Sequence, residues 1–184
     1  RQVKGQLQVV VAKGHVLPDM TENVKCGNSL IGTDYFDGKL EIDIEEMKEI
    51  KPFDWEKEFK DIFSRRGDLT PGPLRQAQCI ASPDGEGSSK GGFDCVIGNP
   101  PYIRIQNLQE YQPQVIPYIK SKYHSALSGN IDIYVIFIEK GMSILNQSGK
   151  LGFILPSKFF ATDYGAATRK LLTDKKALEK IIDF

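Results

Sequence analysis

The chain has 184 residues, of which 40% are hydrophobic and 10% aromatic, so it has the length and composition of one globular domain and not of a disordered segment. Its 24 basic and 24 acidic residues give a formal net charge of zero, which excludes a histone-like polycation but not a local nucleic-acid site. No apolar run reaches the roughly 18 residues of a membrane span, and the three cysteines match neither a disulfide framework nor a zinc site, so we expect a cytoplasmic protein without a metal centre.

The first half of the chain contains short and ambiguous elements. Residues 23–31 predict a short strand that runs into a turn at Gly27 and Asn28. The apolar residues of 40–47 fit either a strand or a helix, and the pattern leaves both open. One face of a further helix is predicted by Trp55, Phe59, Ile62 and Phe63. Residues 64–92 are dense in Gly, Pro and Ser and have no apolar period, which predicts a flexible insertion.

The second half of the chain alternates strands and helices. The predicted elements are a strand at 93–98, a helix at 131–146, a strand at 150–155, a helix at 163–173 and a strand at 180–184. The strand at 93–98 is apolar enough to be buried on both faces. Asn130 is the candidate cap of the helix at 131–146, which is apolar nearly all round and therefore buried. This alternation predicts an α/β fold with a mostly parallel sheet.

A candidate reactive loop, Asn99-Pro100-Pro101-Tyr102, follows the strand at 93–98 directly. Ligands of open α/β sheets bind at the carboxyl ends of strands. The two prolines fix the backbone and supply no N–H, so the loop offers acceptors, namely the Asn99 side-chain oxygen and the Pro100 carbonyl. Two acceptors suit the two hydrogens of a planar amino group, and Tyr102 offers an aromatic face on which a base can stack.

Such a loop suits the transfer of a methyl group to an exocyclic or amide nitrogen. The lone pair of that nitrogen is delocalised, and two acceptors localise it and point it outward. The enzyme then has to align the nitrogen with an electrophilic methyl group and stabilise developing charge. The sulfonium methyl of S-adenosylmethionine is the expected electrophile. The alternative interpretation is a tight surface turn with a core tyrosine.

The sequence FDCVIGNPPYI resembles the motif of DNA methyltransferases that modify adenine at its N6 amine. The resemblance to the methylase region of the type IIG restriction–modification family covers most of the chain. It is carried, in order, by NVKCGNSLIGTDYF, FDWEKEFKDIF, GGFDCVIGNPPYIRIQNL, GNIDIYVIFIEKGMSILNQSGKLGFILPSKFF, YGAATRKLL and IIDF.

The resemblance implies roles for the loop residues and for an upstream turn. Asn99 and Pro100 would accept hydrogen bonds from the target amine, and Tyr102 would stack on an adenine flipped out of double-stranded DNA. Asn28 falls where the family has a residue that touches the adenine ring of the cofactor, and Ser29 follows it. Gly-Asn-Ser is also a common turn, so a purely structural role for this pair stays open.

Further candidates line the expected target pocket. Pro101 belongs to the loop itself, and Asp132 matches the family's helix beside the cofactor and target. Ser157 and Lys158 follow a strand end on the same side of the predicted sheet. A helix first turn is the structural alternative for Asp132, and for Ser157 and Lys158 the pattern leaves open whether they line the pocket.

By the same resemblance, residues 1–184 form part of a methyltransferase catalytic domain with a truncated Rossmann-like class I fold. The glycine-rich cofactor loop, the acidic residue that holds the cofactor ribose and the target-recognition domain are absent from the chain. We therefore expect this segment alone neither to bind S-adenosylmethionine nor to methylate DNA. The intact protein is expected to be a site-specific adenine methyltransferase of a restriction–modification system, with fused nuclease and target-recognition domains.

Two other interpretations remain open. The first is a related methyltransferase that acts on a protein glutamine or on an RNA guanine amine. The second is a non-catalytic remnant that keeps its fold. The long stretch between the early strand and the loop favours the DNA family over the first alternative.

Overall fold

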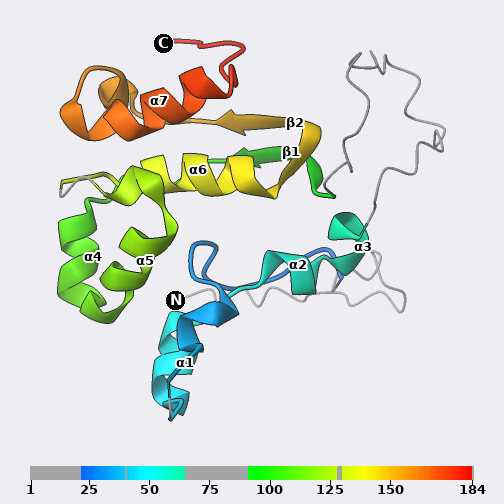
Figure 1. The fold of residues 1–184 in the computed structure, drawn as a ribbon, viewed down its shortest axis with the longest axis vertical. Helices are drawn as coiled ribbons and strands as arrows, with labels where there is room; N and C mark the ends of the chain where they lie inside the picture. Colours follow the sequence, from blue (N-terminus) through cyan, green and yellow to red (C-terminus); the bar gives the residue numbers. More distant parts are fainter. Residues whose placement is uncertain (1–21, 40, 65–90, 128–129, 184) are drawn as a thin grey trace, which may run out of the picture.

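The computed structural model describes residues 22–39, 41–64, 91–127 and 130–183. The helices are α1 Ile44–Ile50, α2 Trp55–Glu58, α3 Lys60–Phe63, α4 Ile105–Tyr111, α5 Ile116–Lys122, α6 Tyr134–Ile144 and α7 Ala166–Asp174 (Figure 1). The strands are β1 Phe93–Gly98 and β2 Leu145–Phe153. Short 3₁₀ helices span Thr33–Phe36, Pro113–Val115, His124–Ala126, Ser157–Phe160 and Asp163–Gly165.

Strands β1 and β2 pair in parallel, and the connection between them contains α4, α5 and α6. The pairing begins at Phe93 with Leu145 and jumps to Cys95 with Lys150, so β2 carries a bulge over 146–149. A parallel pair joined through helices is the basic unit of an α/β fold, which confirms that prediction at this level. The predicted helix stop at 147–149 is instead this bulge, because α6 already ends at Ile144.

Strand β1 is not buried on both faces as predicted. Ile97 is 83% exposed, and Cys95 is exposed as well. The described residues form a sheet of two strands, so β1 has a neighbouring strand along one edge only. The apolar composition of the strand was read correctly, but burial of both faces requires partners that the described residues do not supply.

Two predicted strands are absent from the described residues. In the segment 23–31, Asn28 forms a single bridge with Pro52, and its backbone N–H donates to the carbonyl of Lys51 at 2.7 Å. Its backbone partner is thus a neighbouring loop and not a sheet, and the turn falls at Ser29 and Leu30. Residues 180–183 are exposed and have no regular structure. Strands need a partner edge, and neither segment has one here.

The N-terminal helices resolve one ambiguity and correct one prediction. The segment at 40–47 forms a helix from Ile44, whose cap Asp43 accepts a hydrogen bond from Glu45 N at 2.8 Å. The single helix predicted at 55–63 is two short helices that break at Phe59. The aromatic face was nevertheless predicted correctly, because Trp55, Phe59 and Phe63 surround the ring of Phe93 at centroid distances of 5.3–5.8 Å.

Helix α6 is the buried centre of the fold, as predicted, but it begins later. Ile133 replaces Asn130 as the cap residue, and no side chain caps the helix. The residues before it pair with the segment that follows the reactive loop, since Ile105 N donates to Ile131 O at 2.9 Å and Ile133 N donates to Ile103 O at 2.8 Å. This pairing takes the backbone groups that an earlier first turn would have used.

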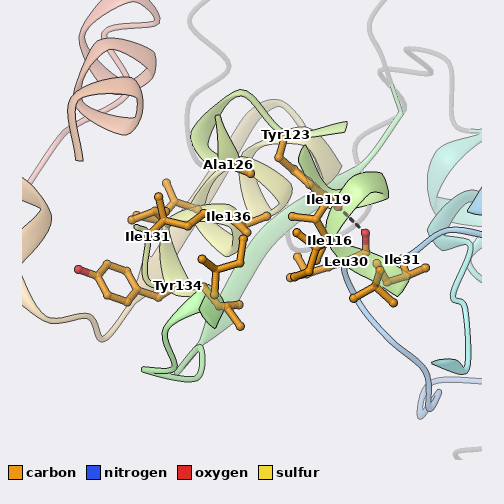
Figure 2. Close-up of a cluster of buried hydrophobic side chains, with 14 of the residues drawn as sticks. Leu30, Ile31, Ile116, Ile119, Tyr123, Ala126, Ile131, Tyr134 and Ile136 are labelled. Atoms are coloured by element: carbon orange, nitrogen blue, oxygen red, sulfur yellow. Dashed lines mark hydrogen bonds between the residues drawn. The ribbon is translucent and has the colours of Figure 1, made fainter. Parts of the chain in front are cut away.

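A single hydrophobic cluster joins the N-terminal loop, α5 and α6. Figure 2 shows Leu30 and Ile31 beside Ile116 and Ile119 of α5, with Ile136 of α6 in the same cluster. Tyr123 donates a buried hydrogen bond to the carbonyl of Leu30 at 2.8 Å, which fixes the N-terminal loop against the end of α5 (Figure 2). The loop that contains Asn28 and Ser29 is therefore anchored to the same core as α6.

Three further predictions concern the last helix, the insertion and the lack of a membrane span. The helix at 163–173 is confirmed as α7, preceded by a 3₁₀ turn. The predicted insertion at 64–92 lies almost entirely outside the described residues and stays a prediction. Across the described ranges, none of the helices has the length and apolar character to cross a membrane.

Gly165 offers a test of the packing between the segment after β2 and α7. A Cβ atom at this position would lie 1.9 Å from the carbonyl oxygen of Phe159, so the backbone has to move to accommodate it. We expect Gly165→Ala to lower the free energy of unfolding by about 1–3 kcal/mol. Gly152→Ala in β2 is the matched control, because its Cβ meets no atom within 4 Å. Chemical denaturation of both variants measures the difference, and equal stabilities would contradict the close approach.

Candidate functional site

The loop Asn99–Tyr102 leaves the carboxyl end of β1, as the sequence predicts. Ile154 N donates to Gly98 O at 3.2 Å, so the backbone pairing between the two strands extends to Gly98, the residue directly before the loop. Pro100 is buried, whereas Asn99 and Tyr102 are exposed. The loop is thus fixed through one proline, and its two polar side chains face solvent.

The side chains of Asn99 and Tyr102 contact each other. The Tyr102 hydroxyl lies 2.8 Å from Asn99 Oδ1 and 3.0 Å from the carbonyl oxygen of Ile154. The hydroxyl has one hydrogen to share between these two acceptors. Asn99 Oδ1 therefore keeps at least one lone pair for a further donor, and its orientation is defined by Tyr102.

The ring of Tyr102 is partly exposed and contacts a neighbouring aromatic ring. Its edge packs against Tyr134 at a centroid distance of 6.2 Å and an interplanar angle of 86°. The residue remains 51% exposed. An exposed ring held by a buried neighbour is the arrangement that a base-stacking platform needs.

Next to Tyr102, the side chains of Tyr134, Tyr164 and Asp132 form a chain of hydrogen bonds, of which the sequence analysis names only Asp132 as a site residue. The hydroxyls of Tyr134 and Tyr164 lie 2.9 Å apart, and Tyr164 donates to Asp132 Oδ2 at 2.9 Å. Burial, and the hydrogen bond with Tyr164, raise the pKa of Tyr134 well above its ordinary value. Tyr164 was not predicted as a site residue. It lies 32 positions from Asp132, so no local pattern pairs them.

Asp132 is a predicted substrate contact, and a place in a helix first turn is its structural alternative. It instead precedes α6, in a bridge with Arg104, and its carboxylate accepts the hydrogen bond of Tyr164. The structure therefore places Asp132 beside the loop, with a hydrogen-bond partner within the protein. Its role toward a substrate remains a prediction.

Ser157 and Lys158 start the 3₁₀ helix after β2, and both are exposed. They follow Ile154, whose carbonyl contacts the Tyr102 hydroxyl, by three and four residues. The next residue, Phe159, is buried and packs against Tyr134 at 6.1 Å. This anchor keeps the segment near the loop, although no contact of the Ser157 or Lys158 side chain with the loop residues is observed within the described residues.

Asn28 and Ser29 differ in how they relate to the loop. Asn28 Oδ1 accepts from Leu30 N at 3.2 Å, which is a local turn contact. Ser29 lines a cavity of about 220 Å³ together with Asn99, Pro100 and Pro101. The structure thus brings Ser29 and the loop to one cavity, whereas Asn28 does not line it.

The cavity residues suit part of a nucleoside cofactor. Trp55 and Phe137 give the cavity apolar aromatic walls, which suit the flat face of an adenine ring. No carboxylate is among the described residues that line it, so these residues do not supply a ligand for ribose hydroxyls. The cavity residues therefore fit the adenine base of such a cofactor and not its ribose.

A larger hollow of about 590 Å³ adjoins this cavity through Trp55. Two ion pairs lie among its charged side chains: Lys57 Nζ is 3.0 Å from Asp54 Oδ2, and Lys122 is bound to Asp34. The pairing of Lys122 with Asp34 favours a structural role for this lysine. Among the described residues, no group of three or more His, Cys, Asp or Glu side chains is arranged to hold a metal ion.

The sequence of this chain is similar to one family of proteins and to several known relatives. The family of Eco57I restriction-modification methylases matches residues 7–184. The chain is similar to the type II restriction enzyme and methyltransferase RM.Eco57I of Escherichia coli, at 41% identity over 92 residues, which cover 50% of this chain and 9% of that protein. It is also similar to the type II methyltransferase M.HincII of Haemophilus influenzae, at 39% identity over 95 residues, which cover 52% of this chain and 19% of that protein.

A third relative is the type II methyltransferase M.BstVI of Geobacillus stearothermophilus, at 34% identity over 91 residues, which cover 50% of this chain and 16% of that protein. The chain therefore spans less than a fifth of the length of these relatives. No solved structure matches the chain.

Proposed function

The chain belongs to the Eco57I restriction-modification methylase family, and from this membership we propose that the intact protein is a DNA methyltransferase that transfers a methyl group from S-adenosylmethionine to the N6 amine of adenine. The proposal includes a Rossmann-like class I fold, in which the β1–β2 pair is part of a larger parallel sheet. The observation that carries the function is the loop Asn99–Tyr102, which leaves β1 with a fixed acceptor beside an exposed ring.

Asn99 is proposed to hold the target amine with Pro100. The Asn99 side-chain oxygen and the Pro100 carbonyl oxygen accept one hydrogen each from the amino group, which localises the nitrogen lone pair. Contact with Tyr102 fixes the direction of Asn99 Oδ1 before the substrate arrives. Acceptors that need no reorganisation stabilise the positive charge that develops on the nitrogen during the transfer.

Tyr102 is proposed to capture the base after it leaves the duplex. The target atom is inaccessible inside stacked DNA, so the adenine has to be extruded. The exposed ring of Tyr102 offers a stacking surface worth about 1–3 kcal/mol per base. Pro101, Ser157 and Lys158 are the proposed borders of this pocket, because they adjoin the loop or the segment that contacts it.

The cofactor is proposed to approach from the side of Ser29. S-adenosylmethionine supplies the electrophilic methyl group when it is bound. Within this chain, Ser29 in the cavity and the preceding residue Asn28 are the proposed contacts to its adenine ring, and Trp55 and Phe137 are the proposed apolar walls beside it. Ribose and methionine contacts come from other parts of the intact protein in this proposal.

The proposed partner is double-stranded DNA, and the proposed setting is a restriction–modification system. Support comes from the relative RM.Eco57I, which is named as both a restriction enzyme and a methyltransferase. We propose that the intact protein likewise carries a nuclease and a target-recognition region. Exposed basic residues that follow the loop, such as Arg104 and Lys120, are proposed phosphate contacts.

Product analysis tests this function. The intact protein is incubated with S-adenosylmethionine labelled in its methyl group and with duplex DNA, and the DNA is digested to nucleosides. We expect the label in N6-methyladenine. Label in N4-methylcytosine would overturn the adenine assignment. Label in an added protein glutamine or RNA guanine, and in no DNA base, would overturn the DNA substrate. No transfer to any of these acceptors would contradict the methyltransferase proposal.

A further inference from the structure

The hydrogen-bonded chain behind Tyr102 has a defined direction. The carboxylate of Asp132 accepts hydrogen bonds and has none to give, so the single hydroxyl hydrogen of Tyr164 goes to Asp132. The Tyr164 oxygen is then the acceptor in its 2.9 Å contact with Tyr134, and Tyr134 is the donor. The order is therefore Tyr134 to Tyr164 to Asp132.

This chain holds the ring that supports Tyr102. Tyr134 is fully buried, and its ring makes T-shaped contacts with the rings of Tyr102 and Phe159. Figure 2 shows Tyr134 at the border of the hydrophobic cluster with its hydroxyl directed away from the other labelled residues. That hydroxyl is hydrogen-bonded to the Tyr164 hydroxyl and to the backbone of Phe159, so the position of the ring depends on the segment that follows β2.

We propose that Tyr164 is a positioning residue for the target pocket: by binding the Tyr134 hydroxyl and Asp132 together, it holds Tyr134 against Tyr102 and so fixes the stacking ring and the Asn99 oxygen that Tyr102 contacts. The inference rests on the proposed function. Tyr164 itself touches neither Asn99 nor Tyr102 in the observed hydrogen bonds and ring contacts, so its effect passes through Tyr134.

Tyr164→Phe removes the central hydroxyl and keeps the ring. A buried donor on Tyr134 and the carboxylate of Asp132 then lose their partner. The intact protein provides a matched control in Tyr118→Phe, because Tyr118 is also half-buried and also donates to an aspartate, Asp34 Oδ1, at 2.6 Å. Tyr118 borders the larger hollow and not the loop.

The experiment compares wild type, Tyr164→Phe and Tyr118→Phe in steady-state methylation of duplex DNA, with enzyme concentrations corrected for active sites. We expect kcat of Tyr164→Phe to fall about tenfold. Its KM for DNA should stay within twofold, because duplex affinity comes mainly from phosphate contacts that Tyr164 does not make. Tyr118→Phe should keep both parameters within twofold.

A duplex with 2-aminopurine at the target position reports extrusion and stacking separately from chemistry. We expect the bound Tyr164→Phe complex to show a brighter signal than wild type, because a displaced Tyr102 quenches the extruded base less. The pair Tyr164→Phe and Asp132→Ala should be non-additive in kcat, since each breaks the same chain.

The outcomes separate this inference from the proposed function. Equal kcat and equal fluorescence for Tyr164→Phe and Tyr118→Phe, in a protein whose wild type methylates DNA, would overturn the positioning role alone. Additive effects of the Tyr164 and Asp132 changes would also overturn it. A wild type that fails to methylate DNA would contradict the proposed function instead. If Tyr164→Phe does not fold, the Asp132→Ala variant is tested for the same kcat loss and brighter signal, and a normal result for it overturns the inference.

Discussion

Replacing Asn99 by alanine is expected to lower the methylation rate of the intact protein by about 10²–10³-fold while leaving the fold unchanged. The substitution removes the acceptor that the structure holds beside Tyr102 at 2.8 Å. The loop itself should persist, because Pro100 is buried and the prolines still restrict the backbone. Single-turnover methylation at saturating DNA measures the effect on the transfer step.

Asn107→Ala is the matched control for this change. Asn107 is an exposed asparagine on α4, and its replacement removes the same side chain away from the loop. We expect it to keep the wild-type rate, and we expect both variants to unfold at similar temperatures. A normal methylation rate for Asn99→Ala would mean that the loop is a structural turn, and the assignment of a methyltransferase site to it would then be wrong.

Replacing Tyr102 by alanine should lower the turnover by about 10–100-fold, because it removes a stacking interaction of about 1–3 kcal/mol. Tyr102→Phe should retain most of the activity. It keeps the exposed ring and loses the hydroxyl that lies near Asn99 Oδ1 and the Ile154 carbonyl. Asn99 Oδ1 keeps its lone pair for the target amine in this variant, and only the contact that orients it is lost.

The contrast between the two Tyr102 variants decides which part of the side chain matters. If phenylalanine and alanine lower the rate equally, the hydroxyl is the important group and stacking is not the main role. If neither lowers the rate, Tyr102 is not part of the target pocket. Binding of 2-aminopurine duplexes by both variants gives an independent measure of the stacking step.

Much of the site was predictable because its signals are local. A strand, an acceptor loop and a tyrosine lie within ten consecutive residues, and the structure places them in that order. The buried helix α6 was predictable for a related reason, since its apolar residues repeat on all sides at helical spacing.

The errors arise where distant segments decide the local conformation. The start of α6 is delayed because residues 131–133 pair with 103–105, and a bulge at 146–149 extends β2 through residues that resemble a helix stop. The segment at 23–28 has strand-like composition but bonds to residues 51–52. Tyr164 was missed because its partners lie about 30 positions away, and single-sequence patterns carry no signal at that distance.

A crystal structure of the intact protein with a target duplex and a non-reactive analogue of S-adenosylmethionine would test the central claim most directly. The account predicts an extruded adenine whose N6 lies about 3 Å from both Asn99 Oδ1 and the Pro100 carbonyl oxygen, with its ring stacked on Tyr102. An adenine that stays within the duplex, or one extruded into a pocket that does not include Asn99 and Tyr102, would contradict it.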